Sequence, residues 1–450
     1  MALLKDVWRA PLLRTVSRPW VTFQERLRHL HRGSLRRLPF FPYLAILGPG
    51  LVAAAAGDDA GGIATYASAG ASYGYDLLWV IVLVTVSLIV VQEMCARMGA
   101  VTGKGLSELI RERFGPRWTV FAMLLLLIAN GVITISEFAG IAASLELFGV
   151  TKYVSVPVSA ALIWWLVTRG SYAKIERVFL VMTLAFFAYP IAAYLAHPDW
   201  ATVIQKSVVP TFRVDPGFIF IFVATIGTTI TPYMQIYVQS SVVDKGITAR
   251  EYHYERVDVV FGSIFGNVIS FFIVVSTAAT LFARNVTINT AADAALALEP
   301  VAGHYAVILF AVGLLGASVL AAAVLPVATA FSITEAFGWE KGLSFDPSEA
   351  PAFYFLFTSL IVIGALVTLI PGVPLIQLLL VVQVINCLLL VPLLIFIVRL
   401  SSDGEVMGSH RNGLVYNTLA WVTVVAIGAL SILYVLANLL APLVGLNLGG

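Results

Sequence analysis

The sequence predicts an all-α integral membrane protein that crosses the bilayer eleven times. Three observations lead to this fold class: 60% of the 450 residues are hydrophobic, the mean hydropathy is +0.93, and apolar runs of about 20 residues recur along the chain. Soluble domains use only about 45 to 50% apolar residues, so a soluble fold could not bury this much apolar surface. We therefore expect a multi-pass protein of the cell membrane, either plasma or inner, with the lipid bilayer as its surroundings.

The apolar runs also predict the domain organisation. A basic N-terminal segment, 1–39, precedes one transmembrane domain, 40–440, and a short tail, 441–450, follows it. The transmembrane domain divides into a first repeat at about 40–198, a second repeat at about 217–400 and one extra span at about 414–440. The expected spans are 40–72, 76–98, 119–146, 153–169, 175–196, 217–243, 257–283, 304–337, 352–371, 374–399 and 414–440.

The basic residues predict the orientation of these spans. Nine Lys and Arg residues precede the first span, against Asp6 and Glu25, and more basic residues follow spans 2, 4, 6 and 10. Because loops rich in Lys and Arg stay in the cytoplasm, the N-terminus is expected inside. We expect no cleavable signal peptide, since the first 37 residues are basic and interrupted by Pro11 and Pro19.

Composition and motifs exclude several functions. A net charge of +2 does not suggest a nucleic-acid partner. Cys95 and Cys387 lie in apolar segments, which favours packed thiols over a disulfide or a thiolate metal site. The zinc-enzyme pattern HExxH and a glycine-rich phosphate loop are absent from the sequence. We therefore expect neither an enzyme nor an ATP-driven pump, with no resident cofactor and no obligate protein partner.

Two spans contain helix-breaking residues at corresponding places. Span 1 carries GDDAGG from Gly57 to Gly62, and span 6, five spans later, carries GTTITP from Gly227 to Pro232. Glycine costs about 1 kcal/mol in a helix interior and proline about 3 kcal/mol, so both spans are expected to be unwound at mid-membrane. A matched pair of interrupted helices indicates an inverted five-plus-five repeat with the substrate between the breaks.

Two adjacent carboxylates, Asp58 and Asp59, lie in the first break. Each charge at a helix centre costs about 2.5 to 3.5 kcal/mol on insertion scales, and no Lys, Arg or His lies between Arg37 and Arg97. A divalent cation would relieve this repulsion, with Gly61 and Gly62 expected to leave backbone carbonyls available. The alternatives are that the pair lies just outside the hydrocarbon, or that one Asp is protonated and caps the helix at Ala60.

The second break offers oxygen ligands. Thr228, Thr229 and Thr231 supply hydroxyl groups, which suit Mg²⁺, Ca²⁺ and Mn²⁺ better than softer metals. Each threonine could instead bond back to its own helix, and we interpret Met234 as a packing residue. Gln383 in span 10 is a further candidate ligand, and Asn386 lies one turn later.

Polar residues in other spans suggest an aqueous path and a structural pair. Asn130 and Glu137 are seven residues apart, so they share one face of span 3 and could line a water-filled path. Glu93 and Arg97 have the i, i+4 spacing of a structural ion pair.

At these residues the sequence resembles the Nramp family of divalent metal transporters, from about Leu47 to Gly413. The stretches that carry the resemblance are GPGLVAAAAGDDAGGIAT at 48–65, QEMCARMGAVTGKGLSELIRERFG at 92–115 and GTTITPYMQIYVQSSVV at 227–243. The resemblance implies the leucine-transporter-like fold of paired inverted repeats, and a divalent cation as substrate.

The resemblance also assigns ligand positions. The family's metal-binding Asp falls on Asp59, its Asn on Gly62, its carbonyl-donating Ala on Thr228 and its Met on Thr231, while its span 10 glutamine falls on Gln383. Two ligand side chains are thus lost, and Asp58 is an additional carboxylate.

These departures point to the Nramp-related magnesium transporter branch. Loss of the soft Met ligand removes a barrier to Mg²⁺, and a site with few direct ligands suits an ion that keeps its water. The family's conserved histidine becomes Tyr233, and two span 3 acids fall on Asn130 and Gly140, which leaves Glu137. We therefore expect import of largely hydrated Mg²⁺, and of Mn²⁺ as well, by alternating access without proton coupling.

Three other functions remain open. The first is an ordinary proton-coupled Mn²⁺ or Fe²⁺ transporter of the same family, which Gln383 and Glu137 favour. An amino-acid or Na⁺ symporter of the same fold ranks lower, because the Asp58 and Asp59 pair would repel a substrate carboxylate. A membrane-embedded enzyme with Asp-rich Mg²⁺ motifs would need a second acidic cluster, and the sequence has none within the membrane.

Overall fold

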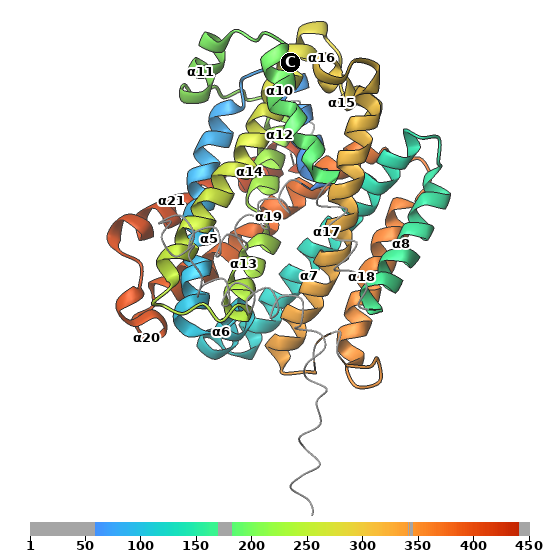
Figure 1. The fold of residues 1–450 in the computed structure, drawn as a ribbon. Helices are drawn as coiled ribbons and strands as arrows, with labels where there is room; N and C mark the ends of the chain where they lie inside the picture. Colours follow the sequence, from blue (N-terminus) through green and yellow to red (C-terminus); the bar gives the residue numbers. More distant parts are fainter. Residues whose placement is uncertain (1–58, 170–181, 341, 343–344, 441–450) are drawn as a thin grey trace, which may run out of the picture.

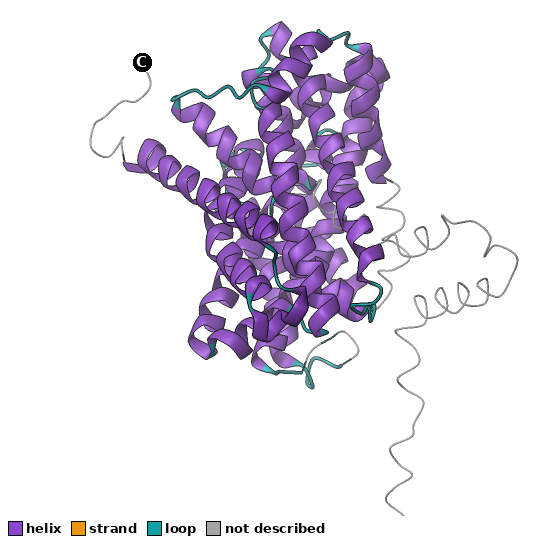
Figure 2. Ribbon diagram, turned by 90° about the vertical axis from the view of Figure 1, so that its left-hand side faces the viewer, coloured by secondary structure: helices purple, strands orange, loops and turns teal. Residues whose placement is uncertain are grey.

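The chain is all-helical, as predicted. The computed structural model (Figure 1) describes residues 59–169, 182–340, 342 and 345–440. Within these ranges the chain forms helices and loops without strands, as Figure 2 shows. The terminal segments 1–39 and 441–450 and the first half of span 1 lie outside the described residues. The predicted site residues Gly57 and Asp58 therefore lie outside them too.

The helices correspond closely to the predicted spans. In chain order the main ones are α4 (Ala60–Tyr73), α5 (Leu78–Thr102), α6 (Leu106–Phe114), α7 (Pro116–Glu146), α8 (Lys152–Thr168), α10 (Ala188–Leu195), α11 (Trp200–Val208), α12 (Pro216–Thr229), α13 (Pro232–Asp244), α14 (Tyr252–Thr280), α17 (Ala306–Phe337), α18 (Pro351–Thr368), α19 (Leu375–Ser402) and α21 (Leu414–Tyr434). The short helices α15 (Ala291–Ala295) and α16 (Glu299–Ala302) precede α17, and α20 (Gly404–Met407) follows α19.

Eight helical segments of the described chain are long and apolar enough to cross a membrane. Two shorter apolar helices, α8 and the segment Leu184–Leu195 that ends in α10, fall at the predicted spans 4 and 5. The count of eleven spans and the inside position of the N-terminus stay predictions. Some boundaries differ from expectation: α5 continues to Thr102 and ends where Gly103 takes a left-handed conformation, with φ 66°.

Helix α7 lies at the centre of the bundle. It packs against α17, α19 and α4, while α14 covers α4 and α5, and α12 packs on α19. Small residues allow the closest contacts: a Cβ on Gly140 of α7 would lie 2.4 Å from the Cβ of Ala60 in α4. This packing brings α4, which follows the first predicted break, against α7 and α19, and brings α12, which precedes the second, against α19.

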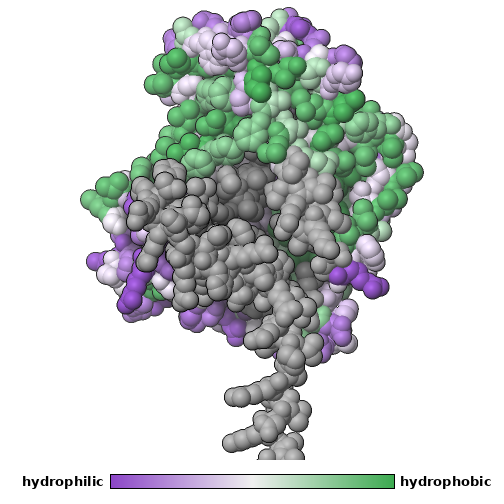
Figure 3. All heavy atoms as spheres, viewed as in Figure 1, coloured by the Kyte–Doolittle hydropathy of each residue, from purple (hydrophilic) through white to green (hydrophobic). Residues whose placement is uncertain are grey.

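The surface has the character of a membrane protein. In Figure 3 hydrophobic side chains cover the middle of the visible described surface, and hydrophilic ones gather toward its two ends. Val158 on α8, Leu366 on α18 and Val425 on α21 are 60%, 60% and 65% exposed. Exposed aliphatic side chains on long apolar helices are what lipid contact requires.

The predicted structural pair and thiols are confirmed. Arg97 lies 3.2 Å from Glu93, and the same guanidinium donates to the backbone carbonyl of His410 at 2.6 Å. Cys95 and Cys387 are both buried and free. The Arg97 contacts tie α5 to the loop before α21, so this pair stabilises the fold.

Candidate cation site at the two helix breaks

Span 6 is interrupted where the sequence predicted. Helix α12 ends at Thr229 and α13 begins at Pro232, with Ile230 (φ −118°, ψ 80°) and Thr231 (φ −83°, ψ 145°) between them in non-helical conformations. Proline lacks a backbone N–H and disfavours the helical conformation of the residue before it, which explains the break at this position. Pro232 therefore starts α13 and leaves Thr231 as its N-cap residue.

Asp59 caps the helix that follows the first break. It is 4% exposed, and its Oδ1 accepts a hydrogen bond from the backbone N–H of Gly62 at 2.6 Å. Capping was one alternative to metal binding, but the two roles are compatible, because a carboxylate has about four lone-pair directions. The carboxylate is thus held at the positive end of α4, where a helix stabilises negative charge.

The glycines beside Asp59 act through close packing. The expectation that Gly61 leaves its carbonyl free is wrong, because the residue lies inside α4 and its carbonyl accepts from the Thr65 hydroxyl at 2.7 Å. Instead, a Cβ on Gly61 would lie 1.8 Å from Nε2 of Gln383, and a Cβ on Gly227 would lie 1.9 Å from the Gln383 carbonyl oxygen. The first turn of α4 and the last turn of α12 therefore both meet α19 at Gln383.

Gln383 is fully buried at this junction. Its Oε1 accepts from Nδ2 of Asn386 at 3.1 Å, and its Nε2 has no hydrogen-bond partner among the described residues. An amide with unused hydrogen-bonding capacity, held between the two breaks, is positioned to contact a bound ion or its water.

Glu137 faces the same junction from α7. It is 0% exposed, no side chain donates a hydrogen bond to its carboxylate in the described part of the chain, and both the backbone N–H of Ala60 and the Asp59 carboxylate lie within its electrostatic reach. Two buried carboxylates without a basic partner cannot both hold a negative charge unless a cation or proton compensates it. The arrangement therefore favours binding of a cation or of a proton.

The threonines of the second break have different environments. Thr229 bonds back to the Thr225 carbonyl at 2.6 Å and also contacts the Tyr66 hydroxyl at 2.8 Å, as the structural alternative predicted. The Thr228 hydroxyl is buried without a partner among the described residues, and it lines a small cavity toward α14. Thr231 is 3% exposed, and its side chain makes no capping hydrogen bond.

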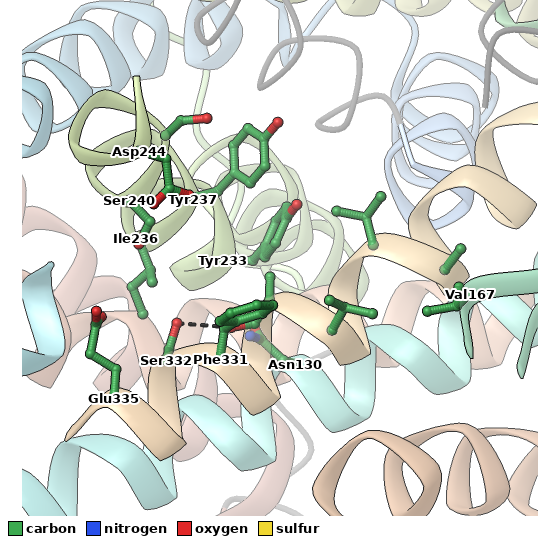
Figure 4. Close-up of a pocket in the computed structure, with 15 residues that line it drawn as sticks. Asn130, Val167, Tyr233, Ile236, Tyr237, Ser240, Asp244, Phe331, Ser332 and Glu335 are labelled. Atoms are coloured by element: carbon green, nitrogen blue, oxygen red, sulfur yellow. Dashed lines mark hydrogen bonds between the residues drawn. The ribbon is translucent and has the colours of Figure 1, made fainter. Parts of the chain in front are cut away.

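A larger cavity of about 330 Å³ lies between α7, α13 and α17 (Figure 4). Asn130 and Tyr233 both line it, whereas Glu137 is not among its lining residues, so the aqueous path stays a prediction. Asp244 and Glu335 lie toward its left end in Figure 4. Because Tyr233 follows the break directly, this cavity leads from the second break along α13.

Sequence reasoning missed several polar residues near the junction. Ser136 is buried beside Gly61, and Gln92 and Asn267 line the small cavity next to Thr228. Each of them is a polar residue within an apolar span. The sequence has many other such residues that do not lie near the junction, so this feature alone does not single them out. Among the described residues, no group of three or more His, Cys, Asp or Glu side chains could hold a metal. A cation here would therefore depend on few charged ligands.

Comparison with known proteins identifies the family. Residues 50–437 match the Nramp family model, described as natural resistance-associated macrophage protein-like. The divalent metal cation transporter MntH of Deinococcus radiodurans is 30% identical over 418 residues, which cover 89% of this chain and 90% of that protein. The MntH of Erwinia tasmaniensis is 32% identical over 61% of this chain and 68% of its own length.

Solved structures share the fold. The Eremococcus coleocola manganese transporter, in complex with an aromatic bis-isothiourea compound, has a TM-score of 0.71 at 20% identity, covering 90% of this chain and 89% of its own. MhsT in complex with L-phenylalanine has a TM-score of 0.54 at 13% identity, covering 86% of this chain and 97% of its own.

These matches support the predicted leucine-transporter-like architecture and the multi-pass membrane location, but they give no support to the magnesium branch. The family model spans most of the chain, and the Deinococcus relative aligns along nearly all of it. The chain therefore belongs to the Nramp family of membrane transporters.

Proposed function

We propose that this chain is a secondary transporter that imports divalent cations by alternating access, with the ion bound between the two helix breaks. The observation that carries the proposal is the buried Asp59 carboxylate at the start of α4, where Glu137 lies within electrostatic reach, without a basic partner among the described residues, and Gly61 packs against Gln383. Buried carboxylates without basic partners require a positive charge for compensation. Direct ligands in this proposal are Asp58, Asp59, Thr228 through its backbone carbonyl, Thr231 and Gln383.

The relatives favour Mn²⁺ as the substrate. The MntH proteins are described as divalent metal cation transporters, and the similar solved structure is a manganese transporter. Mn²⁺ accepts carboxylate, carbonyl and water ligands, so the oxygen donors of this site suit it. Transport of Mg²⁺ as a largely hydrated ion is a further proposal, which rests on the oxygen of Thr231 and on the additional carboxylate of Asp58.

The proposed transport could proceed with or without coupling to protons, and different residues support each case. Transport without protons is supported by Tyr233 and Asn130 at positions where the resemblance leads us to expect titratable groups. Glu137 favours the opposite, because a fully buried carboxylate without a partner can take up a proton when the cation leaves. An amino-acid substrate is disfavoured, since Asp59 already occupies the helix N-terminus that would hold a substrate carboxylate.

The test is flux into proteoliposomes. Purified protein is reconstituted, and entry of Mn²⁺ and Mg²⁺ is followed with metal-sensitive dyes inside the vesicles, alongside a pH-sensitive dye. We expect saturable entry of Mn²⁺ that competes with Mg²⁺. Vesicles without protein are the control, and absence of entry for both ions would contradict the proposal.

The Thr231→Met variant tests the ionic preference. A thioether at this position would add a soft ligand and remove an oxygen, so we expect the ratio of Mn²⁺ to Mg²⁺ entry to rise by about tenfold, or about 1.4 kcal/mol. Thr229→Val is the matched control, because the Thr229 hydroxyl already bonds within α12. An unchanged ratio in Thr231→Met would mean that this side chain does not set selectivity.

A further inference from the structure

A small cavity lined by buried residues lies beside the second break, next to Thr228 and Thr229. Its volume is about 20 Å³, and it is bounded by α4, α5, α12, α13 and α14. All of its lining residues are buried, and most of them are polar, including Thr228, Gln92, Ser263 and Asn267. A polar cavity within a membrane-embedded bundle is costly unless its polar groups are satisfied.

Two atoms in this cavity lack partners in the described structure. The Thr228 hydroxyl, on a residue 1% exposed, and Nδ2 of Asn267, on a residue 7% exposed, have no hydrogen bond. The neighbouring groups are already engaged: Oε1 of Gln92 accepts from Ser263 at 2.9 Å, and its Nε2 donates to the Met234 sulfur at 3.8 Å. The hydrogen-bonding groups of this cavity that lack a partner therefore belong to Thr228 and Asn267.

The size and chemistry of the cavity select one ligand. A site of 20 Å³ has room for one water molecule, which needs about 10 to 15 Å³. Water can accept from the Asn267 amide and also donate to the Thr228 hydroxyl or to the second lone pair of Gln92. A metal ion fits poorly, because no carboxylate lines the cavity.

We propose that this cavity holds a resident water molecule, bound by Thr228 and Asn267, and that Asn267 positions the second break for cation binding through this water. The inference rests on the proposed function, because it assigns the cation to that break. Thr228 lies two residues before Ile230, where the non-helical pair begins, so fixing its side chain also fixes the backbone that turns toward the ion. Water-mediated bridges are nearly as strong as direct hydrogen bonds.

The experiment combines a density map with cation affinity. The full chain in lipid nanodiscs is imaged at a resolution that shows ordered water, and Mn²⁺ binding is measured by calorimetry. Asn267→Leu fills the cavity and removes the amide, whereas Asn267→Ser keeps a hydrogen-bonding group. Val268→Leu is the matched control, because Val268 is the next residue on α14 and is 44% exposed.

We expect water density between Thr228 and Asn267 in the wild type, and none in Asn267→Leu. We also expect the Kd for Mn²⁺ to weaken by about tenfold in Asn267→Leu, and by no more than about twofold in Asn267→Ser and Val268→Leu. A wild-type map without water density in the cavity would overturn the water site, whether or not the protein binds Mn²⁺. Unchanged Kd in a folded Asn267→Leu, or a Kd in Asn267→Ser as weak as in Asn267→Leu, would overturn the positioning role.

Discussion

At the scale of single residues, the junction is defined by one carboxylate that has two tasks. Asp59 caps α4 through Gly62 and supplies a buried negative charge beside Glu137. Substitutions can separate these tasks, because asparagine caps a helix about as well as aspartate but carries no charge.

The Asp59→Asn variant is therefore expected to keep the fold but to bind the cation weakly. Removing the charge that binds the cation should weaken the Kd for Mn²⁺ by about 100-fold or more, since charge-assisted contacts in a buried site are the strong ones. Calorimetry on the purified protein measures this, and a thermal scan checks that the variant unfolds within a few degrees of the wild type. Wild-type Mn²⁺ affinity in this variant would exclude Asp59 as a ligand.

Gly61 has a steric role that its position inside a helix does not reveal, because it makes room for the Gln383 side chain. In an ordinary helix interior, alanine is more stable than glycine by about 1 kcal/mol. At Gly61 the added methyl group would overlap the Gln383 amide, at 1.8 Å from Nε2. We expect Gly61→Ala to displace Gln383, weaken Mn²⁺ binding and destabilise the protein by about 1 to 3 kcal/mol.

The matched control is Gly131→Ala on α7, where the nearest atom to the added Cβ, a Leu360 methyl, lies at 3.4 Å. We expect this variant to unfold at a temperature equal to or above that of the wild type. If both variants behave alike in thermal unfolding and in Mn²⁺ calorimetry, the close approach of α4 to α19 is not required.

At the scale of elements, α4 follows the first predicted break and α12 precedes the second. The C-terminal end of α4 and the N-terminal end of α12, both away from Gln383, are tied together. The buried Asp76, in the turn between α4 and α5, accepts from Lys206 at 2.7 Å and pairs with Arg213 in the α11–α12 linker. Tyr73 at the end of α4 donates to Asp215, the N-cap residue of α12, at 3.2 Å. These contacts couple α4 and α12, so the two helices should move as one unit.

Asp76→Asn tests this coupling. The variant loses both charged contacts of a side chain that is 7% exposed, and we expect destabilisation of about 1 to 3 kcal/mol, seen as a lower unfolding temperature. The control is Glu299→Gln, which breaks the exposed pair of Arg284 and Glu299, where less than about 1 kcal/mol is expected. Equal effects of the two variants would contradict a structural role for the Asp76 cluster.

At the scale of the whole molecule, the predicted orientation in the membrane rests on the distribution of charge alone. The loop between α13 and α14 carries Arg250, which the distribution of basic residues places inside, and Thr287 lies beyond the other end of α14. Both residues are exposed, while Cys95 and Cys387 are buried, so added cysteines can be labelled selectively.

We expect a membrane-impermeant maleimide to label Thr287→Cys in intact cells and Arg250→Cys only after the membrane is permeabilised. Wild-type protein, with its two buried cysteines, is the control for background labelling. The reverse pattern would invert the predicted topology.

The sequence by itself determined the helical membrane architecture, the break before Pro232 and the family. These features depend on local composition and on short-range rules: apolar runs long enough to span lipid, a proline that cannot continue a helix, and motifs that keep their order along the chain. The Glu93 and Arg97 pair was predictable for the same reason, because both residues lie on one helix at a fixed spacing.

Only the tertiary structure decided which polar groups meet. Gln383 contacts Gly61, more than three hundred residues away, Glu137 lies within electrostatic reach of Asp59, and Thr228 and Asn267 line one cavity. Helical periodicity indicates which residues share a face, but the relative height and rotation of two helices come from how their side chains interlock. The predicted carbonyl role of Gly61 failed for this reason, since the physical need for glycine there is the close approach of α19.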